Sequence, residues 1–384
     1  SGKLEWWLAN GLGGYASGTV SGILSRRYHG LLVTPATPAS GRMLLFVKAD
    51  ATLLHDMTET PLHANQWNQG EIVPEGYLQI EHFYLDGNMP VWQYRAGKYL
   101  IEQRIWMPHG SNQTCVAFRM VNFASTNPTQ PSIRLDLIAS YRDHHNVNAV
   151  NSFQLSSQRT NHGLQLHYPR GEKLHLFSEH GQFTEDNTWI ENFFLQEEQR
   201  RGLESIDHHL RVGKLEIPLS GDWNGLVISQ EKIKAFNLVQ SMTQEYQRMT
   251  DILEEAFPGL RFVSKPAWVF QLVAAADSFL FERQNKENEV NESIIAGYPW
   301  FAEWGRDTMI ALPGLCLATG RYDVAWRILK TFSDFVDEGM LPNNFSGHGE
   351  KPEYNSVDAS LWYIEAWRAY FQATGDLDAI DEAL

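Results

Sequence analysis

A chain of 384 residues with 43 % hydrophobic and 20 % charged residues has enough apolar material for a sizeable core, which excludes global disorder. Its formal net charge of −15 argues against nucleic acid as a partner, because nucleic-acid binding relies on Lys and Arg to neutralise phosphates. Aromatic residues make up 12 % of the chain, and this number of flat rings suits a sugar-binding surface as well as an ordinary core.

Cys115 and Cys316 are the two cysteines of the chain, and they fall in what we predict to be different domains. A disulfide framework is therefore not expected, and this usage is typical of a reducing compartment. The N-terminal sequence SGKLEWWLANGLGG lacks a basic region followed by an apolar run, and the chain has no window of about 18 apolar residues. We therefore predict a cytoplasmic protein that has no membrane partner.

The first part of the chain has the period of β-strands. Segments rich in β-branched and aromatic residues at a period of two predict strands at 77–87, 91–106, 113–123 and 132–141. The segment 91–106 indicates a hairpin that turns at 95–98, and 164–177 indicates another that turns at 169–171. Many antiparallel strands with no helical stretches between them predict an N-terminal antiparallel β-domain over residues 1–230, either a sandwich or a two-sheet super-sandwich.

After residue 230 the period changes to that of helices. The segment 231–257 has helical spacing and ends before Pro258-Gly259, so we predict a helical linker over 231–262. Further helices are predicted at 266–283, 307–318, 322–337 and 358–373, with another that starts near 377. Loops rich in Gly, Pro, Asn and Trp join them, which favours an α/α toroid over 263–384. Five or six helices are too few to close an (α/α)6 toroid, so we expect the toroid to be incomplete.

The stretch YPWFAEWGRDTM (298–309) combines several rings with a charged pair. In one reading the rings pack under a helix, Asp307 caps that helix, and Arg306 pairs with a surface carboxylate. In the other, Arg306 and Asp307 form a buried pair that binds sugar hydroxyls, while Trp300 and Trp304 stack on the sugar ring. The residues alone leave both readings open.

The stretch GHGEKPEYNSVDASLWYIEAW (347–367) predicts a helix that begins near Asp358 and is capped by Ser356 or Asn355. An Asp in a first helical turn is ordinary, because the helix dipole favours a negative charge there and lowers its pKa. Nearby rings such as Tyr354 would instead raise the pKa of Asp358, as a general acid requires. Upstream, Asn343 lies either in a plain turn or in a loop that offers its amide to sugar hydroxyls.

Other features carry weaker signals. The pairs His144-His145 and His208-His209 lack metal-ligand spacing and are predicted to lie in solvated loops. The glycine-rich segment 10–18 lacks the spacing of a dinucleotide site. The segment SRRYHGLLV (25–33) indicates either a structural clasp to the helical domain or a contribution of the sandwich to a sugar pocket.

Taken together, four motifs resemble the amylo-α-1,6-glucosidase type of glycogen debranching enzymes, including bacterial and archaeal forms. The segment 5–33 resembles the N-terminal signature of that family. The segments 300–315, 341–345 and 353–363 resemble the start of its catalytic toroid. The resemblance implies a β-super-sandwich followed by an (α/α)6 barrel, and hydrolysis, with inversion, of the α-1,6-linked glucose at glycogen branch points.

Carried over residue by residue, the resemblance implies that Asp358 is the general acid and that Trp304, Arg306 and Asp307 grip the terminal glucose. It places the general base in a segment that this chain does not contain, and Glu303 and Glu353 match positions to which we assign no role. We therefore expect the first part of a longer enzyme, inactive by itself as a hydrolase.

The sequence thus predicts a site with one catalytic and seven substrate-binding residues: Asp358, with Trp300, Trp304, Arg306, Asp307, Asn343, Tyr354 and Asn355. We expect neither a metal nor another cofactor, and the partners implied are glycogen or branched α-glucan oligosaccharides. Two alternatives stay open. One is a glucoamylase-like α-1,4-glucosidase or a related toroidal phosphorolytic enzyme, and the other is a non-catalytic glycan-binding protein. The oligomeric state is not predicted.

Overall fold

The computed structural model describes residues 2–36, 41–68, 70–122, 130–259, 265–284, 290–344 and 352–383. By contacts between residues the chain divides into two compact units. Unit 1 comprises Ser1–Leu8, Gly14–Thr34 and Arg42–Thr243, and unit 2 comprises Ala9–Gly13, Pro35–Gly41 and Gln244–Leu384.

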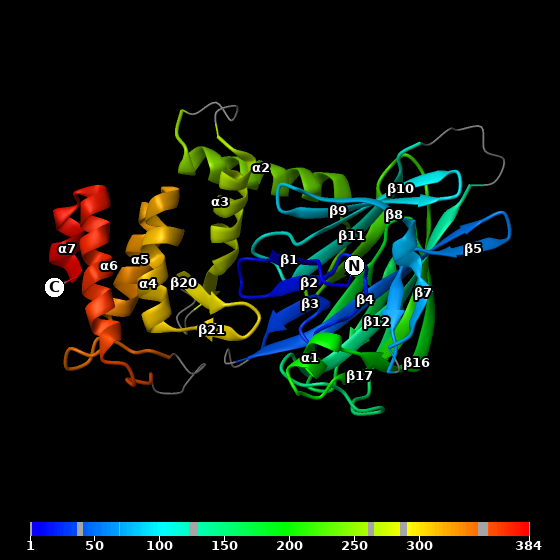
Figure 1. The fold of residues 1–384 in the computed structure, drawn as a ribbon, viewed down its shortest axis with the longest axis horizontal. Coiled ribbons are helices and arrows are strands. Elements are labelled where there is room, and N and C mark those ends of the chain that lie inside the picture. Colours follow the sequence, from blue (N-terminus) through cyan, green and yellow to red (C-terminus); the bar gives the residue numbers. More distant parts are fainter. Residues whose placement is uncertain are drawn as a thin grey trace. The chain divides into compact units, whose positions relative to one another are not determined.

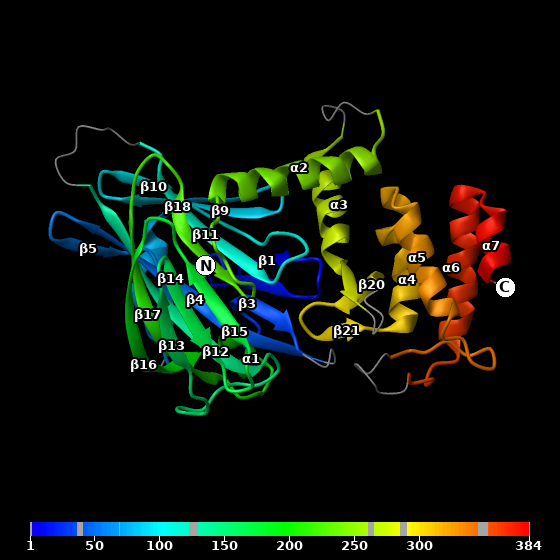
Figure 2. The same cartoon turned by 180° about the vertical axis from the view of Figure 1, so that it is seen from behind.

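Unit 1 contains two large antiparallel sheets. The first has, in spatial order, β1 (Glu5–Ala9), β2 (Tyr15–Thr19), β3 (Gly30–Pro35), β4 (Arg42–His55), β12 (Ser132–Asp143), β17 (Ile206–Pro218) and β16 (Gln182–Phe194), with β5 (Thr58–Pro61) paired with β4 (Figure 1). The second has, in spatial order, β13 (Ser156–Thr160), β14 (Gly163–His167), β15 (Lys173–Phe177), β18 (Asn224–Ser229), β11 (Gln113–Met120), β10 (Tyr99–Trp106), β9 (Met89–Ala96) and β8 (Ile80–Asp86) (Figure 2).

The core of unit 1 is built from inward-facing residues of both sheets. It joins fully buried side chains of the first sheet, such as Leu53 and Leu135, to those of the second, such as Ile101 and Leu226. Along strands such as β12, alternate residues of the first half are buried, because successive side chains point to opposite faces. The prediction of an antiparallel β-rich N-terminal region is therefore confirmed.

Both predicted hairpins are present. β9 and β10 pair in the register Tyr99↔Ala96, so the turn lies within the predicted 95–98. β14 and β15 pair in the register His167↔Lys173, which encloses the predicted turn at 169–171. Smaller elements that the sequence did not predict are β6 (Ala64–Gln66), β7 (Ile72–Glu75), the 3-10 helix η1 (Gly76–Gln79) and the short helix α1 (Gln196–Arg200).

The segment 25–33 forms a clasp to residues of unit 1, whereas the sequence had left open a clasp to the helical domain or a contribution to a sugar pocket. The guanidinium of Arg27 lies 3.4 Å from the buried carboxylate of Glu198, and its Nη2 donates to the Glu204 carbonyl at 2.9 Å. His29 contributes a 3.2 Å contact between its Nε2 and Oε1 of Glu5. The clasp therefore joins the start of the chain to the α1 region.

The expectation that both histidine pairs lie in solvated loops is wrong. His144 is 2 % exposed, and His209 is 1 % exposed on strand β17. Burial lowers the pKa of His209 to about 4, although the carboxylate of Asp207 opposes this effect. A pair of adjacent histidines carries no periodicity, so the sequence could not show that one of them faces the core.

Unit 2 contains helices and a small sheet. In chain order these are α2 (Leu238–Ala256), whose first residues belong to unit 1, α3 (Ala267–Phe279), β19 (Leu280–Gln284), β20 (Val290–Gly297), β21 (Phe301–Glu303), α4 (Gly305–Leu315), the 3-10 helix η3 (Leu317–Thr319), α5 (Tyr322–Ser333), α6 (Asp358–Thr374) and α7 (Leu377–Ala383). Strands β19, β20 and β21 form an antiparallel sheet that the sequence analysis did not predict.

Four predicted helices have different bounds in the structure: the helix expected over 307–318 is α4 at Gly305–Leu315, the one expected over 322–337 ends at Ser333, and the other two differ for local reasons. The helix expected from residue 231 begins at Leu238, because the side chain of Asn237 accepts a hydrogen bond from the backbone N–H of Gln240 at 2.9 Å and caps the helix there. The helix expected over 266–283 ends at Phe279 and continues as β19, since Leu280 already has extended backbone angles.

The core of unit 2 gathers apolar side chains from the strand β20 and from helices α4 to α7. Met309 and Leu312 of α4 meet Ile328 of α5, and Trp367 of α6 joins the same cluster. Helices α4 and α6 thus pack together, which brings the two predicted site motifs into one unit. The segment Ala9–Gly13 also belongs to unit 2, where the Gly11 carbonyl accepts a hydrogen bond from the backbone of Glu282 at 2.7 Å.

Candidate active site

Three segments that are distant in sequence come together at the start of α4. Trp304 precedes α4 and forms an isolated β-bridge with Asn344, which in turn forms a bridge with Glu353. Glu353 is followed closely in the chain by α6, which begins at Asp358. The structure therefore brings together the motifs 300–307, 341–344 and 353–358. Phe345 and residues 346–351 lie outside the described residues.

Asn343 connects all three segments. Its backbone carbonyl accepts from the N–H of Gly305 at 2.9 Å, and its Oδ1 accepts from the N–H of Arg306 at 3.1 Å. Its Nδ2 donates to Oδ1 of Asn355 at 3.0 Å. Asn343 is 8 % exposed, so both ends of its amide are engaged with the protein. Within the described residues this side chain positions its neighbours.

Gly305 makes the close approach of these segments possible. A Cβ atom at this position would lie 2.1 Å from the carbonyl oxygen of Pro342, far inside van der Waals contact. The sequence analysis did not single out Gly305. The signal that could have found it is a glycine between Trp304 and Arg306, where a helix former is otherwise preferred.

Asp358 has two polar partners. Oγ of Ser356 donates to Oδ1 of Asp358 at 2.6 Å, and Nη1 of Arg306 lies 3.5 Å from Oδ2. The hydrogen bond from Ser356 has the largest effect and lowers the pKa of Asp358 below its usual value; burial opposes it, and the charge of Arg306 lowers the pKa further. The side chains of Arg306 and Asp358 are 48 % and 50 % exposed. The sequence had left the direction of this pKa shift open, and the structure gives a lowered pKa.

The structure corrects two details of these motifs. Arg306 and Asp307 are not a buried pair: both are exposed, and Arg306 pairs with Asp358 instead. The residue at the cap position of α6 is Val357, which makes no side-chain capping bond, so neither Ser356 nor Asn355 caps the helix. Ser356 bonds to the carboxyl of Asp358 because that oxygen lies two residues on and within reach.

The predicted rings differ in their exposure and in their contacts. Trp304 is half-buried at the cap position of α4, where it makes no side-chain capping bond. Trp300 lies in the turn between β20 and β21 and is 40 % exposed. Tyr354 is 37 % exposed, and its hydroxyl donates to the carbonyl of Phe335 at 2.8 Å. Each of these rings keeps accessible surface.

The two other carboxylates of the motifs differ in their surroundings. Glu303 is 7 % exposed on β21 and accepts a short hydrogen bond from Oγ of Ser293 on the neighbouring strand β20. Glu353 is exposed, and its Oε2 lies 3.4 Å from Nδ2 of Asn355. Among the described residues, His, Cys, Asp and Glu side chains form no group of three or more that could hold a metal ion.

Comparison with known families identifies the chain. A family model described as glycogen debranching enzyme N terminal matches residues 4–223, and one described as amylo-alpha-1,6-glucosidase matches residues 274–384. The first match covers more than half of the chain, so this chain belongs to the glycogen debranching enzyme family. The resemblance carried by the four motifs is thereby confirmed.

Individual proteins show the same relationship. A glycogen debranching enzyme of Saccharomyces cerevisiae is 34 % identical over 93 residues, which are 23 % of this chain and 6 % of the yeast protein. A bacterial glucoamylase complexed with acarbose has a similar fold, with a TM-score of 0.51 and 11 % identity over 97 % of this chain and 56 % of that chain. A putative kojibiose phosphorylase from the human microbiome has a TM-score of 0.34 and 10 % identity, over 97 % of this chain and 54 % of that chain.

The chain spans about half the length of these solved structures and a small part of the yeast protein. In the part of the chain that the structure describes, none of the helices combines the length and the apolar character that crossing a bilayer requires.

Proposed function

We propose that the protein is a glycoside hydrolase that removes α-1,6-linked glucose from the branch points of glycogen or of related α-glucans, with Asp358 as its general acid. The observation that carries this proposal is the position of Asp358. Its carboxyl lies at the start of α6, 3.5 Å from Arg306 at the start of α4, next to the loop that holds Trp304. Membership of the glycogen debranching enzyme family supports the substrate class.

In this proposal the exposed groups contact the terminal glucose. Trp304 and Trp300 stack on the apolar face of the sugar ring, while Arg306 donates to hydroxyl oxygens and Asp307 accepts from hydroxyl groups. Tyr354 and Asn355 complete the polar lining. Asn343 was predicted to contact sugar as well, but its amide is bonded to Arg306 and Asn355 and therefore acts by holding them in place.

A general acid must carry a proton when the leaving oxygen departs, whereas the pKa of Asp358 is lowered while Ser356 and Arg306 contact it. A bound glucose resolves this conflict in two ways. Its hydroxyl groups compete with Asp358 for the guanidinium of Arg306, and its ring displaces water from the half-exposed carboxyl. Both changes raise the pKa of Asp358, so substrate binding and protonation favour each other.

An inverting mechanism also needs a general base, with the two carboxyl groups roughly 6.5–9.5 Å apart so that a water molecule fits between them. We assign this role to neither Glu303 nor Glu353, because the first is buried against Ser293 and the second is exposed beside Asn355. The inverting course of the reaction follows from the family resemblance and is part of the proposal.

We further propose that unit 2 forms part of an (α/α)6 toroid. Helix α6 exposes Leu361 and Ile364, at 64 % and 65 %, on a side away from the core of unit 2, which supports packing against further helices as in a toroid. The division of the chain into a sandwich (1–230), a helical linker (231–262) and a toroid part (263–384) is proposed with it, and so is a cytoplasmic location.

The test compares Asp358→Asn with Asp323→Asn in the full-length natural protein. Both residues lie in the first turn of a helix, but Asp323 of α5 is 72 % exposed and lies outside the site motifs, so it is a matched control. Glucose release is measured from a branched limit dextrin and from a linear maltooligosaccharide. We expect Asp358→Asn to lower kcat by about 10²–10⁴-fold and Asp323→Asn to leave it unchanged.

Release from the branched substrate alone supports the α-1,6 specificity. Faster release from the linear substrate would favour the α-1,4-glucosidase, the alternative that the fold of the bacterial glucoamylase supports. A wild-type protein that binds glucan without releasing glucose would refute the enzymatic proposal.

A further inference from the structure

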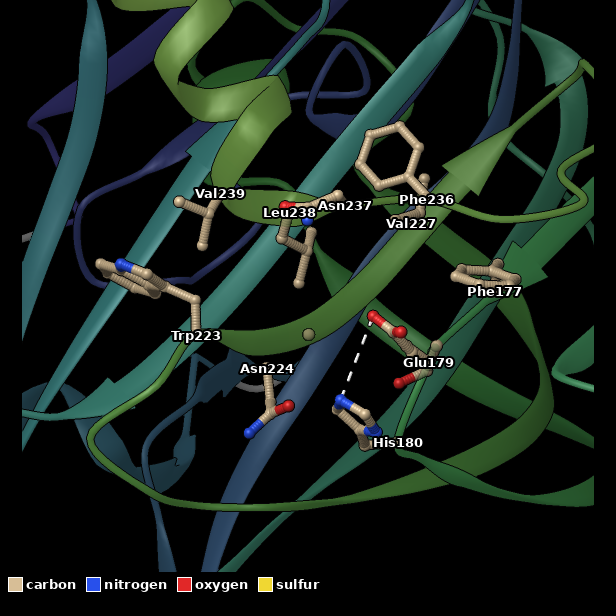
Figure 3. A pocket seen from close by; sticks show the side chains of 12 residues that line it. Phe177, Glu179, His180, Trp223, Asn224, Val227, Phe236, Asn237, Leu238 and Val239 are labelled. Carbon is tan, nitrogen blue, oxygen red and sulfur yellow. Dashed lines mark ion pairs between the residues drawn. The ribbon is translucent and has the colours of Figure 1, made fainter.

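Unit 1 has a hollow of its own, formed by residues that are remote in sequence from the candidate active site. It has a volume of about 150 Å³. It lies where the end of β15, the start of β18 and the start of α2 meet, and it is lined by residues of the segments 177–180, 223–227 and 236–239. Figure 3 shows Trp223 on one side of this hollow and Glu179 with His180 on the other.

Trp223 is a ring held in place by charged neighbours. The guanidinium carbons of Arg119 and Arg104 lie 4.6 Å and 5.5 Å from the centre of its ring system. Both guanidinium groups are in turn bonded to the buried carboxylate of Glu102, at 3.2 Å and 2.7 Å. This network fixes the plane of the indole before any ligand arrives, and a half-buried indole that is held in this way is a stacking platform with little freedom to lose.

The polar groups around the hollow suit hydroxyl groups. Asn224 and Asn237 line the hollow together with Phe236. Nδ2 of Asn224 donates to the Pro218 carbonyl at 3.1 Å and Oδ1 of Asn237 accepts from the N–H of Gln240 at 2.9 Å, so Oδ1 of Asn224 and Nδ2 of Asn237 are the amide atoms that a hydroxyl group can meet. On the rim, the exposed side chains of Glu179 and His180 form a loose pair at 4.0 Å, which a ligand can open without a large energetic cost. Amides and a carboxylate beside a flat ring are the groups that recognise a sugar, whose faces are apolar and whose edges carry hydroxyls.

The volume of the hollow and the negative charge of the protein limit which ligands can bind there. A volume of about 150 Å³ is that of a cavity which accommodates a six-membered ring such as benzene, and it is too small for a drug-sized ligand. The carboxylate of Glu179 and the net charge of −15 disfavour an anionic ligand such as a phosphate. A single neutral pyranose unit of a longer chain satisfies both limits.

We propose that this hollow is a second glucan-binding site, which takes one glucose unit of an α-glucan chain by stacking on Trp223. The choice of ligand rests on the proposed function, because a branched polymer offers many chain ends near each branch point. Binding of one chain in this hollow raises the effective concentration of its branches at the active site without any new contact there.

The test uses the full-length natural protein with Trp223→Ala, Glu179→Ala and, as a matched control, Tyr84→Ala. Tyr84 is 40 % exposed on β8 of the same sheet and does not line the hollow. Retardation in native gels that contain glycogen measures binding, in an additional Trp304→Ala background that weakens binding at the candidate active site. Glu179 lies in an exposed turn, so its replacement reports on binding even where Trp223→Ala impairs folding.

We expect about tenfold weaker retention for Trp223→Ala, as for the loss of a central aromatic anchor, and about fivefold for Glu179→Ala, as for the loss of one hydrogen bond. Tyr84→Ala should behave as the wild type. With the active site intact, Trp223→Ala should raise KM for glycogen and leave kcat on a short branched oligosaccharide unchanged. Wild-type retention by both hollow variants would overturn the inference.

Failure of this inference and failure of the proposed function give different results. Glucose release that is unaffected by either hollow variant on glycogen refutes the second site and leaves the enzyme proposal intact. Retention that depends on Trp223 in a protein that releases no glucose refutes the enzyme proposal and supports the glucan site.

Discussion

Replacing Gly305 by alanine tests whether the close contact between α4 and the loop at 341–344 builds the candidate site. The added Cβ would lie 2.1 Å from the Pro342 carbonyl oxygen, so the loop must retreat by about 1 Å to restore a tolerable contact. That shift weakens the bonds from the N–H groups of Gly305 and Arg306 to Asn343, each of which contributes about 1 kcal/mol. We expect a total loss of about 2–3 kcal/mol in the free energy of unfolding.

A second glycine of α4 provides a control for which we expect the opposite change in the free energy of unfolding. Gly314 also lies in α4, but a Cβ at this position meets no atom within 4 Å. Alanine there has no clash and restricts the unfolded chain, so Gly314→Ala should stabilise the protein by about 0.5–1 kcal/mol. Urea unfolding followed by far-UV circular dichroism measures both changes, since helices α3 to α7 lie in unit 2.

Activity gives a second readout in the full-length natural protein. A displacement of about 1 Å at a positioning loop can cost about 10²-fold in rate, so Gly305→Ala should lower kcat/KM by this order, while Gly314→Ala should leave it unchanged. Equal stabilities for the two variants would refute the steric argument. A destabilised Gly305→Ala protein with normal kcat/KM would show that the loop does not position the site.

Three further predictions follow from local contacts. Ser356→Ala removes the bond that lowers the pKa of Asp358, so the alkaline limb of the kcat/KM profile should move to higher pH; an unmoved limb would exclude Asp358 as the general acid. The pKa of Glu5 is lowered to about 2 by the bond from His29, so this carboxylate stabilises the fold above its unfolded pKa. Glu5→Gln should cost about 1 kcal/mol at neutral pH, after allowance for solvent screening, and the difference should fade between about pH 4.5 and 2 in urea titrations. Arg27→Met removes one of the two guanidinium groups that pair with the buried carboxylate of Glu198, the other being that of Arg201 at 3.3 Å, and should cost about 1.5–3 kcal/mol in thermal or urea unfolding with glucan affinity unchanged; reduced affinity at normal stability would favour a role in sugar binding.

The two halves of the chain were predictable to different degrees. The period-two segments correctly predicted the hairpins β9–β10 and β14–β15, because local alternation and turn residues determine such hairpins. The small sheet β19–β21 was missed, since its first strand continues directly from α3 and shares an apolar run with it. A short apolar segment has no period that separates a helix end from a strand.

For the site, the sequence identified the motifs and missed how they connect. Trp304, Arg306 and Asp358 were singled out by residue type, and the structure places them at the starts of two packed helices. The pairing of Arg306 with Asp358 instead of Asp307 joins residues that are far apart in the chain, and no local pattern encodes it. The same holds for the bond from Ser356, whose predicted role was that of a helix cap.

The way in which the N-terminus of α4 is capped connects the stability of this region to the candidate site. The cap residue of α4, Trp304, makes no side-chain bond to the helix, although the first N–H groups of a helix need acceptors. Asn343 supplies both acceptors from a distant loop, with its carbonyl for Gly305 and its side chain for Arg306. The cap position is thereby free to hold Trp304, whose indole we propose to stack on the sugar. A serine or aspartate at that position would cap the helix locally but would remove the ring, so capping by the loop at 341–344 is what makes the role proposed for Trp304 compatible with a stable α4.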